Sequence, residues 1–379
     1  MSQLAAPAVL RLPLRPVYVI TVLAGSFLLF LVQPMFGRLV LPVLGGSPSV
    51  WNVAMLFYQA ALLLGYLYAN QLQRLAVRRQ LLVHLGLFAA AAVTLPIGMA
   101  RWYPPAAGHD PTLWLLGLLA VSIGPVFFVV SAQAPLMQAW FARTGDKDAA
   151  NPYFLYAASN LGSFGALLAY PLVVEPLAGL WPQRLAWSAG FVLLAGLAAM
   201  CGLRAVGAAA ATEQMLQPVI ITARQRLRWV SLAAVASGLL LSTTTHLTTD
   251  LMAMPLLWVV PLAIYLLSFV IGFSAAGPAM TRRAVAAAPV LLLVLGAPVF
   301  QSGNGPAYGM VLAVAGLLLL LALTVALHGT LALERPPAAG LTSFYLWMSV
   351  GGALGGLFCA LLAPMLFSWP WEHPLLARR

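Results

Sequence analysis

Long apolar stretches separated by short polar gaps run along the whole chain. A helix needs about 20 mostly apolar residues to cross the hydrocarbon core of a bilayer. In lipid, a helix is one of the few structures that satisfies every backbone N–H and C=O internally. The pattern therefore predicts an all-α, polytopic transmembrane bundle of about eleven helices. The predicted spans are 17–36, 51–72, 80–100, 113–141, 152–174, 185–204, 229–249, 255–274, 284–301, 307–328 and 341–367.

The gaps between these spans divide the chain into two halves. The longest gap runs over about 205–228 and carries a cluster of arginines. It separates the first six predicted helices from the remaining ones. We therefore expect an N-terminal six-helix half over 1–205, a basic cytoplasmic linker over 206–228, and a C-terminal five-helix half over 229–379.

Residues in the second half repeat residues in the first. Positions of the second span recur in the eighth at an offset of 207 (258 minus 51), and positions of the fifth recur in the eleventh at an offset of 190 (344 minus 154). Both pairs lie six spans apart, so the halves share one orientation, as in the parallel repeats of major-facilitator-like transporters. The prediction is a 6+5 parallel pseudo-repeat. The matching pairs are Trp51 and Trp258, Tyr58 and Tyr265, Gly65 and Gly272, Phe154 and Phe344, Ser159 and Ser349, Gly162 and Gly352, and Gly165 and Gly355.

Composition excludes a water-soluble protein. The chain is 62% hydrophobic and 7% charged, with a mean hydropathy of +0.95. Soluble domains carry about 25% charged residues, so there are too few charges here to cover a water-facing surface. The net charge of +11 does not indicate nucleic-acid binding, because the cations lie in short gaps and form no continuous face. We therefore expect the lipid bilayer as a partner, and no nucleic acid.

The arginines also predict the orientation of the bundle. Cytoplasmic loops of membrane proteins carry an excess of Lys and Arg. With the N-terminus in the cytoplasm, the inner segments hold fourteen of these residues and the outer segments hold five. The exception is the pair Arg378 and Arg379, which falls outside when eleven spans are counted. A twelfth helix missing from the count would explain it.

Three ionisable residues are expected near the outer ends of the first, fifth and seventh spans. They are Arg38, Glu175 and Asp250. Charges in or near a bilayer are costly, so each one is a functional hypothesis. Either they stand separately at the water interface, or they form a paired cluster at the mouth of a central cavity. The sequence leaves both alternatives open.

The seventh span ends in a polar run with six hydroxyls over 242–250. His246 and Asp250 are four residues apart and share one face of a helix. A carboxylate beside an imidazole favours the protonated ring, which suits a proton relay, and Thr244 and Thr248 lie on a neighbouring stripe. The alternative is that the Thr hydroxyls bond back to carbonyls of their own helix and Asp250 caps the next one.

Polar and small residues within the spans indicate how the helices face one another. Polar side chains in lipid need partners, so we expect them in the bundle interior, where they either line a solute pathway or pin helices together. They are Gln33, Asn52, Gln59, Gln133, Ser159 and Asn160. Small residues four apart allow close helix packing. The last span has four such residues, Gly351, Gly352, Gly355 and Gly356.

Several blocks of the sequence resemble one bacterial family. They are QPMFGR at 33–38, LPVLGGSP at 41–48, VWN at 50–52, NPYFLYAASNLGS at 151–163, PLLWVVPL at 255–262, and FYL with SVGGALGG within 344–356. Together they look like the membrane module of the fused major-facilitator/spermidine-synthase-like proteins. The resemblance implies a multi-pass protein of the bacterial inner (cytoplasmic) membrane. In fused members an aminopropyltransferase-like domain follows, and the printed sequence reaches Arg379 without one, so synthase activity is not expected.

Two functional hypotheses follow. The first is a transporter-like bundle for a small solute, with cations among the candidates. The second is a non-transporting scaffold that anchors a separately made spermidine-synthase-like or other enzyme as its partner. An enzyme is not expected, because the chain has no HExxH, no GxSxG and no paired intramembrane aspartates. No metal or cofactor site is expected either, because Cys201, Cys359, His84 and His328 lie singly in apolar runs.

Overall fold

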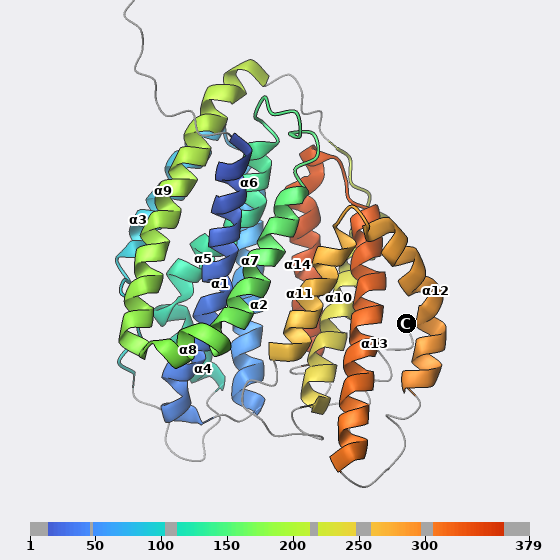
Figure 1. Ribbon diagram of the computed structural model, residues 1–379. Helices are drawn as coiled ribbons and strands as arrows, with labels where there is room; N and C mark the ends of the chain where they lie inside the picture. The colour runs from blue at the N-terminus through green and yellow to red at the C-terminus, as the bar shows by residue number, and fades with distance from the viewer. Residues whose placement is uncertain are drawn as a thin grey trace, which may run out of the picture.

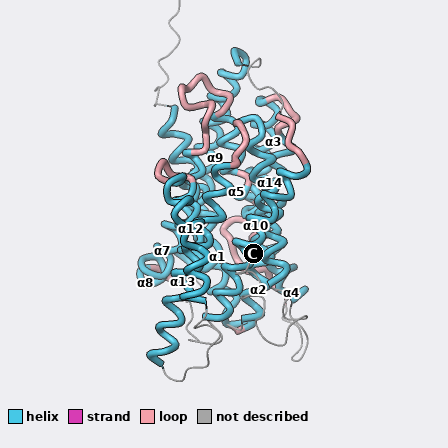
Figure 2. Tube along the Cα trace, turned by 90° about the vertical axis from the view of Figure 1, so that its right-hand side faces the viewer, coloured by secondary structure: helices cyan, strands magenta, loops and turns pink. Residues whose placement is uncertain are grey.

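All regular structure in the described part of the chain is helical, and the long helices run side by side (Figure 1, Figure 2). The computed structural model describes residues 14–45, 48–102, 112–212, 219–247, 259–296 and 306–359. A π-helical turn, η1 (Tyr170–Val174), joins two helices, and a 3-10 turn, η4 (Ala338–Gly340), precedes the last. The helices are α1 (Leu14–Leu44), α2 (Pro48–Leu72), α3 (Val77–Ala92), α4 (Thr112–Ser122), α5 (Gly124–Ser131), α6 (Gln133–Phe141), α7 (Phe154–Ala169), α8 (Glu175–Leu177), α9 (Leu180–Thr212), α10 (Ala223–Thr245), α11 (Val259–Gly272), α12 (Gly277–Gly296), α13 (Pro306–Leu333) and α14 (Leu341–Leu357).

These helices fall where the apolar pattern predicts membrane spans. Among the described residues, seven helices are long and apolar enough to cross a membrane, or eight if a bent pair counts as one span. Each of the predicted spans overlaps helical structure. The prediction of an all-α, multi-pass membrane bundle is therefore confirmed. The tail in which a twelfth helix would begin, 360–379, lies outside the described residues.

The predicted span 113–141 is not one helix, which corrects the sequence reading. α4 ends at Ser122, α5 begins with Pro125 in its first turn, and a second break at Ala132 precedes α6. The helix axis bends by 69° between α4 and the pair that follows. Proline has no N–H to donate and its ring collides with the preceding turn, so it ends one helix and begins another.

The buried apolar side chains form separate clusters in the N-terminal and C-terminal parts of the chain. The largest cluster of buried apolar side chains lies wholly between Val17 and Ala205, on α1 to α9. A smaller cluster around Leu239 and Leu320 joins α10 to α13. Two further clusters bridge these groups, one around Tyr345. Helices α1 to α9 thus share one large apolar core, whereas α10 to α13 share a small one and also pack in the two bridging clusters.

The predicted linker over 206–228 is partly helical. α9 continues to Thr212, and α10 begins at Ala223. Thr222 accepts a hydrogen bond from the Gln225 backbone, and the Gln225 side chain accepts one from the Thr222 backbone. Such a capping box satisfies the free N–H groups at a helix start. The division into six-helix and five-helix halves remains a prediction.

Glycines let helices of the same half approach closely. α7 lies on α1, and α14 lies on α10. A Cβ on Gly162 would collide with the backbone of α1, and a Cβ on Gly351 or Gly355 would collide with the backbone of α10, whereas Gly352 faces open space. Helices in lipid gain no hydrophobic free energy from association, so close packing of this kind holds them together.

The two halves meet along two pairs of helices. α2 packs against α14, and α7 packs against α11. The sequence repeat relates α2 to α11 and α7 to α14. The two contacts are therefore equivalent under the pseudo-symmetry, and they enclose a space at the centre of the bundle.

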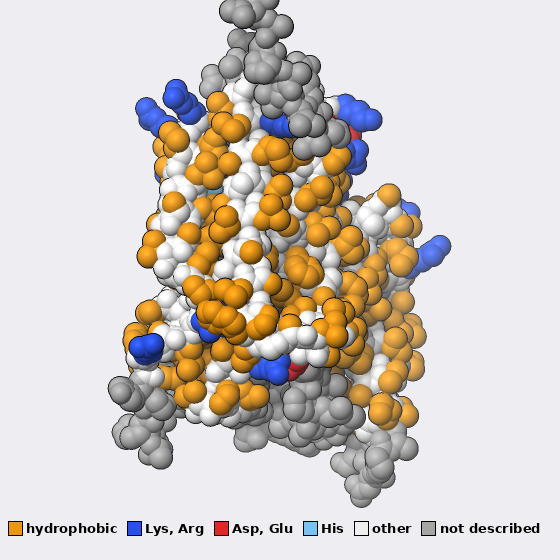
Figure 3. Space-filling view, turned by 60° about the vertical axis from the view of Figure 1, so that its left-hand side comes forward, with side chains coloured by type: hydrophobic (Ala, Val, Ile, Leu, Met, Phe, Trp, Pro, Cys, Tyr) orange, Lys and Arg blue, Asp and Glu red, His pale blue; other side chains and the backbone are white. Residues whose placement is uncertain are grey.

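Apolar side chains cover the middle of the face shown in Figure 3, and most Lys and Arg side chains lie toward the two ends. Exposed apolar side chains include Leu172 on η1 and Leu193 on α9, which are 71% and 65% exposed. Such a surface fits lipid around the middle of the bundle. The described cations at the end where α1 begins are Arg15, Arg74, Arg78, Arg79, Arg143, Lys147, Arg204, Arg224, Arg226, Arg228, Arg282, Arg283 and Arg335, and those at the other end are Arg38, Arg101 and Arg184.

Candidate functional site

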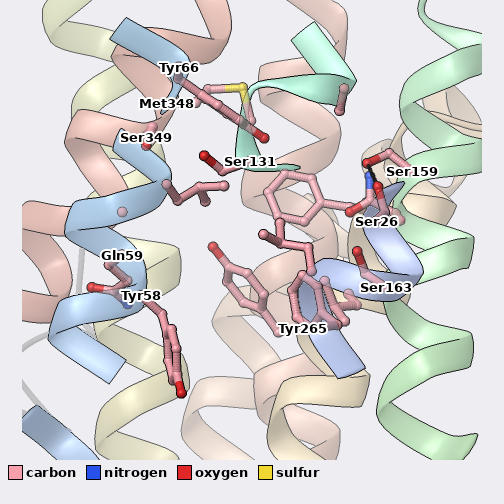
Figure 4. A pocket seen from close by; sticks show the side chains of 18 of the residues that line it. Ser26, Tyr58, Gln59, Tyr66, Ser131, Ser159, Ser163, Tyr265, Met348 and Ser349 are labelled. Carbon is pink, nitrogen blue, oxygen red and sulfur yellow. Dashed lines mark hydrogen bonds between the residues drawn. The ribbon is translucent and has the colours of Figure 1, made fainter. Parts of the chain in front are cut away.

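A cavity of about 190 Å³ lies between the two halves (Figure 4). Its walls come from α1, α2, α5, α6 and α7 on one side and from α10, α11 and α14 on the other. At about 30 Å³ per molecule it has room for roughly six waters, or for one small solute. Sites for small molecules are commonly built between the helices of a bundle, so this cavity is the candidate functional site.

Most polar side chains of the cavity wall already bond to the protein. The hydroxyls of Ser26 and Ser159 are 2.6 Å apart and join α1 to α7. The hydroxyl of Ser237 donates to the carbonyl of Gly352 at 3.0 Å and joins α10 to α14. These groups stabilise helix pairs and have less capacity left for a solute. Backbone carbonyls within the same helix accept from Ser131, Asn160 and Gln33.

Tyr66, Tyr265 and Gln59 differ from this majority. The two phenol hydroxyls and the amide make no hydrogen bond to any described residue. Oε1 of Gln59 is buried against Gly356, so its amide nitrogen is the end that remains accessible. In Figure 4 the side chains of Tyr66 and Tyr265 extend into the same open space. Hydroxyls both donate and accept, so these groups can bind a polar solute.

The rest of the wall is aromatic and aliphatic. Phe30, Phe127 and Phe269 are among its members, and no Asp, Glu, Lys, Arg or His of the described residues lines it. His328 stands one layer behind, with its ring stacked on Phe269 at 3.5 Å between centroids and its Nδ1 2.8 Å from the Ser268 hydroxyl.

Hydrogen bonds between the halves close the cavity toward the end where α1 begins. This is the end at which α2 and α6 finish and α7 and α14 start. We call the three bonds the inter-half latch. Tyr345 donates to Oε1 of Gln138 at 2.8 Å, Thr342 donates to Oδ1 of Asn70 at 3.0 Å, and Tyr153 donates to the carbonyl of Pro336 at 2.6 Å.

Aromatic rings fill the space between the latch and the cavity. Tyr345 stacks on Tyr156, with centroids 4.8 Å apart, and Tyr66 meets the edge of Tyr345 at 6.3 Å. At the loop before α7, burial raises the pKa of Tyr153 above its usual value, although the nearby Arg335 lowers it. The Tyr153 hydroxyl therefore stays protonated and keeps donating to the latch at neutral pH.

The residues predicted from the sequence divide into three groups. Four of them line the cavity, namely Gln33, Gln59, Ser159 and Asn160. Gln133 is buried but lies against Gly25 and outside the cavity wall. Asn52 lies on α2, and its side chain is outside the described residues, as are Thr248 and Asp250 entirely.

The predicted cluster of charged groups at the cavity remains a prediction, because Asp250 lies outside the described residues and Arg38 and Glu175 do not line the cavity wall. Arg38 and Glu175 form an ion pair, with Nε and Oε1 3.5 Å apart and side chains 38% and 31% exposed. The cavity reaches Gln33 on α1, and Arg38 is five residues further along, which is about 7.5 Å of helix rise. The pair therefore lies beyond the cavity, near the end of the bundle.

The polar run at the end of α10 also lies outside the cavity wall. Neither Thr244 nor His246 lines it. The hydroxyl of Thr244 donates to the carbonyl of Leu240 at 2.7 Å, which is the backbone-bonding alternative for this residue. The proton relay, one of the two alternatives for His246 and Asp250, remains a prediction, because Asp250 lies outside the described residues.

The sequence reading missed the tyrosines of the cavity. Tyr58 and Tyr265 were recognised as a repeated pair, and both line the cavity, one from each half. Their position in the repeat was the available signal, because a residue that lies near a pseudo-twofold axis has its repeat counterpart near the axis too. Tyr66 has no counterpart in the repeat, and nothing in its sequence context distinguishes it from an interfacial tyrosine.

Two halves of parallel orientation around a central cavity are the arrangement of the major facilitator fold. A bacterial homologue of the iron transporter ferroportin, in an outward-facing state, has a TM-score of 0.58 and 14% identity, covering 97% of this chain and 95% of its own. The proton:xylose symporter XylE, bound to 6-bromo-6-deoxy-D-glucose, has a TM-score of 0.55 and 13% identity, covering 96% of this chain and 94% of its own. XylE from E. coli in a partially occluded inward-open conformation has a TM-score of 0.54 and 14% identity, covering 96% of this chain and 95% of its own.

These likenesses establish the fold alone, because the identities are low. The chain is thus a multi-pass membrane protein with the major facilitator fold. No family model and no characterised protein matches the sequence. The narrower resemblance to spermidine-synthase-fused proteins finds no support in these comparisons, and it remains a prediction from the sequence blocks.

Proposed function

We propose that this protein is an alternating-access transporter that carries a small, uncharged solute through the central cavity. The observation that carries the proposal is the cavity itself. It lies between the two halves, both halves contribute polar groups to it, and no described charged side chain lines it. A cationic solute, considered from the sequence, has no described carboxylate in the wall to pair with.

The inter-half latch supports movement of one half against the other. Its bonds and stacked rings join the halves beyond the cavity, at the end where α1 begins. Breaking them would open the cavity at that end without disturbing the core of either half. The bonds are few, and each neutral one is worth about 0.5–1.5 kcal/mol net, so the closed and open states can be close in free energy.

The excess of cations at the latch end indicates which end faces the cytoplasm. Thirteen of the described Lys and Arg residues lie there, against three at the other end. The positive-inside rule then puts the latch on the cytoplasmic side and the Arg38–Glu175 pair on the outer side. The conformation described here is closed toward the cytoplasm on this assignment, with the protein in the bacterial inner membrane.

Sided chemical labelling of a cavity cysteine tests the proposal. Ser237→Cys is introduced with Cys201→Ala and Cys359→Ala, and a membrane-impermeant maleimide is added to right-side-out or inverted vesicles. A transporter that alternates is labelled from both sides. A latch held shut by a short bis-methanethiosulfonate crosslinker, which reacts with the thiols of Asn70→Cys and Thr342→Cys and releases methanesulfinate, loses labelling from the latch side only. Labelling from one side alone, whether or not the latch is crosslinked, would contradict alternating access.

The scaffold hypothesis makes the opposite prediction for the same experiment. A static anchor for a separately made enzyme needs no change of access, so the crosslink would have no effect on labelling. A static anchor would also stay bound to its partner enzyme. A pull-down from native membrane that recovers no stable enzyme would count against the scaffold hypothesis. No contact or surface of the described residues favours this hypothesis over transport.

A further inference from the structure

We infer that Tyr66, Tyr265 and Gln59 provide the hydrogen-bonding contacts for a small neutral solute, an amide or alcohol with an apolar body. The inference deepens the proposed function, because the bound molecule would be the one carried. It names the polar contacts within the cavity and excludes the charged classes of solute. Figure 4 shows two of these residues, Tyr66 and Tyr265, reaching into the cavity from different helices.

The hydrogen bonds of the cavity wall narrow the choice to a few open groups, which are these three residues and Ser163; the hydroxyl of Ser349 also lacks a partner, but it is buried. Ser26, Ser159 and Ser237 are already paired within the protein. The hydroxyls of Tyr66 and Tyr265 have no partner among the described residues, yet they are not sealed off from the cavity. A polar group without a partner in such a site is usually satisfied by water or by a ligand.

The amide of Gln59 occupies space that is free only because residue 356 is a glycine. A Cβ on Gly356 would overlap Oε1 of Gln59. The glycine therefore gives the amide room to lie flat against α14, with Oε1 buried there and the nitrogen left open. Gln59 is on α2 and Gly356 is on α14, so the amide occupies the seam between the halves.

The solute contacts both halves at once. Tyr66 and Gln59 belong to α2, and Tyr265 belongs to α11, which is the helix that the repeat relates to α2. A molecule bonded to both helices binds best when the halves have one particular spacing. Its binding free energy can therefore shift the balance between conformations.

The charge class follows from what the wall lacks. A cation would find the faces of Phe127 and Tyr58 but no described carboxylate, and an anion would find hydroxyls and an amide but no described cation. A neutral amide or alcohol needs neither. Its apolar body fits the aromatic wall, and its polar end fits the free hydroxyls and the amide.

Three probes of nearly equal size and different charge test the inference. Benzamide is neutral, benzylammonium is a cation and benzoate is an anion. The midpoint of thermal unfolding of the purified full chain in detergent is measured against the concentration of each probe. We expect saturable stabilisation by benzamide only. Stabilisation by either charged probe of equal or greater strength, or by none of the three, overturns the inference.

Variants locate the binding. Gln59→Leu and Tyr265→Phe should each weaken the apparent affinity for benzamide by about fivefold, which is the loss of one neutral hydrogen bond. Ser237→Ala is the matched control, because its hydroxyl is already bonded within the protein. An unchanged affinity in both Gln59→Leu and Tyr265→Phe would show that benzamide partitions elsewhere.

The two proposals fail separately. If benzamide does not bind while the cavity cysteine is labelled from both sides, the recognition site is wrong and transport stands. If benzamide binds through Gln59 while access does not alternate, the cavity is a binding site in a protein that does not transport.

Discussion

The hydroxyl of Tyr345 donates a hydrogen bond of 2.8 Å to Oε1 of Gln138 and so ties α14 of one half to α6 of the other. Both residues are buried, at 1% and 0% exposure. The ring of Tyr345 stacks on Tyr156, and both residues line the central cavity at its latch end. One side chain therefore contributes to the latch, to the aromatic closure and to the cavity wall.

Removing that hydroxyl should open the latch end. Tyr345→Phe keeps the ring but leaves the buried oxygen of Gln138 without its partner, at a cost of about 1–3 kcal/mol. Since 1.4 kcal/mol is tenfold in an equilibrium, labelling of Ser237→Cys from the latch side should rise roughly tenfold. Tyr68→Phe is the control, because the Tyr68 hydroxyl pairs with His84 within one half. The same increase in both variants would exclude a specific role for the latch.

The glycines of α14 should differ sharply in their tolerance of a methyl group. Gly351→Ala and Gly355→Ala place a Cβ against the backbone of α10, whereas Gly352→Ala meets open space. Overpacking of this kind costs about 1–3 kcal/mol. We expect a lower thermal midpoint in detergent for the first two variants and no loss for the third. Equal midpoints for all three would mean that α10 and α14 do not pack this closely.

Gly356 should act through Gln59 and not through stability. Gly356→Ala pushes the amide of Gln59 out of its position, and a long side chain can move at little cost. The variant should lose benzamide stabilisation as Gln59→Leu does, with nearly the same unfolding midpoint. The double variant with Gln59→Ala should be no worse than Gln59→Ala alone, because the group that collides is gone. Additive losses would point to a separate role for Gly356.

The ion pair of Arg38 and Glu175 should contribute little. Both side chains are about one third exposed and the two atoms are 3.5 Å apart, and such pairs are typically worth 0–1 kcal/mol. Glu175→Gln should therefore change the unfolding midpoint slightly and leave the labelling of Ser237→Cys from both sides unchanged. Loss of alternating access in this variant would instead support the functional cluster predicted from the sequence.

The fold was largely predictable because the property that dictates it is local. Whether about 20 residues can cross a bilayer depends on their own hydropathy, and every predicted span overlaps a helix. The one clear exception is 113–141, where Pro125 stands at a break. The apolar run is continuous across that break, so hydropathy alone predicts one helix there. The proline within the run was the signal for a break.

The candidate site was predictable only in part. Gln33, Gln59, Ser159 and Asn160 do line the cavity, because polar side chains in a lipid-facing bundle have few other places to go. Arg38 and Glu175 were predicted to lie near one end of the bundle, and they do, but they do not line the cavity wall. The depth of a residue along a helix cannot be read from its polarity. Tyr66 was missed, because a tyrosine is equally common in a core, at an interface and in a cavity.

The amino-acid sequence alone determined that this protein is a membrane-spanning helical bundle and that its halves repeat, because hydropathy and residue spacing are properties of a single segment. Only the tertiary structure decided which polar groups are paired and which are open. Ser26 is satisfied by Ser159, 133 residues away, while Tyr66 and Tyr265 face the cavity without partners among the described residues. That difference depends on which helices meet and how each is rotated, and no segment carries this information by itself.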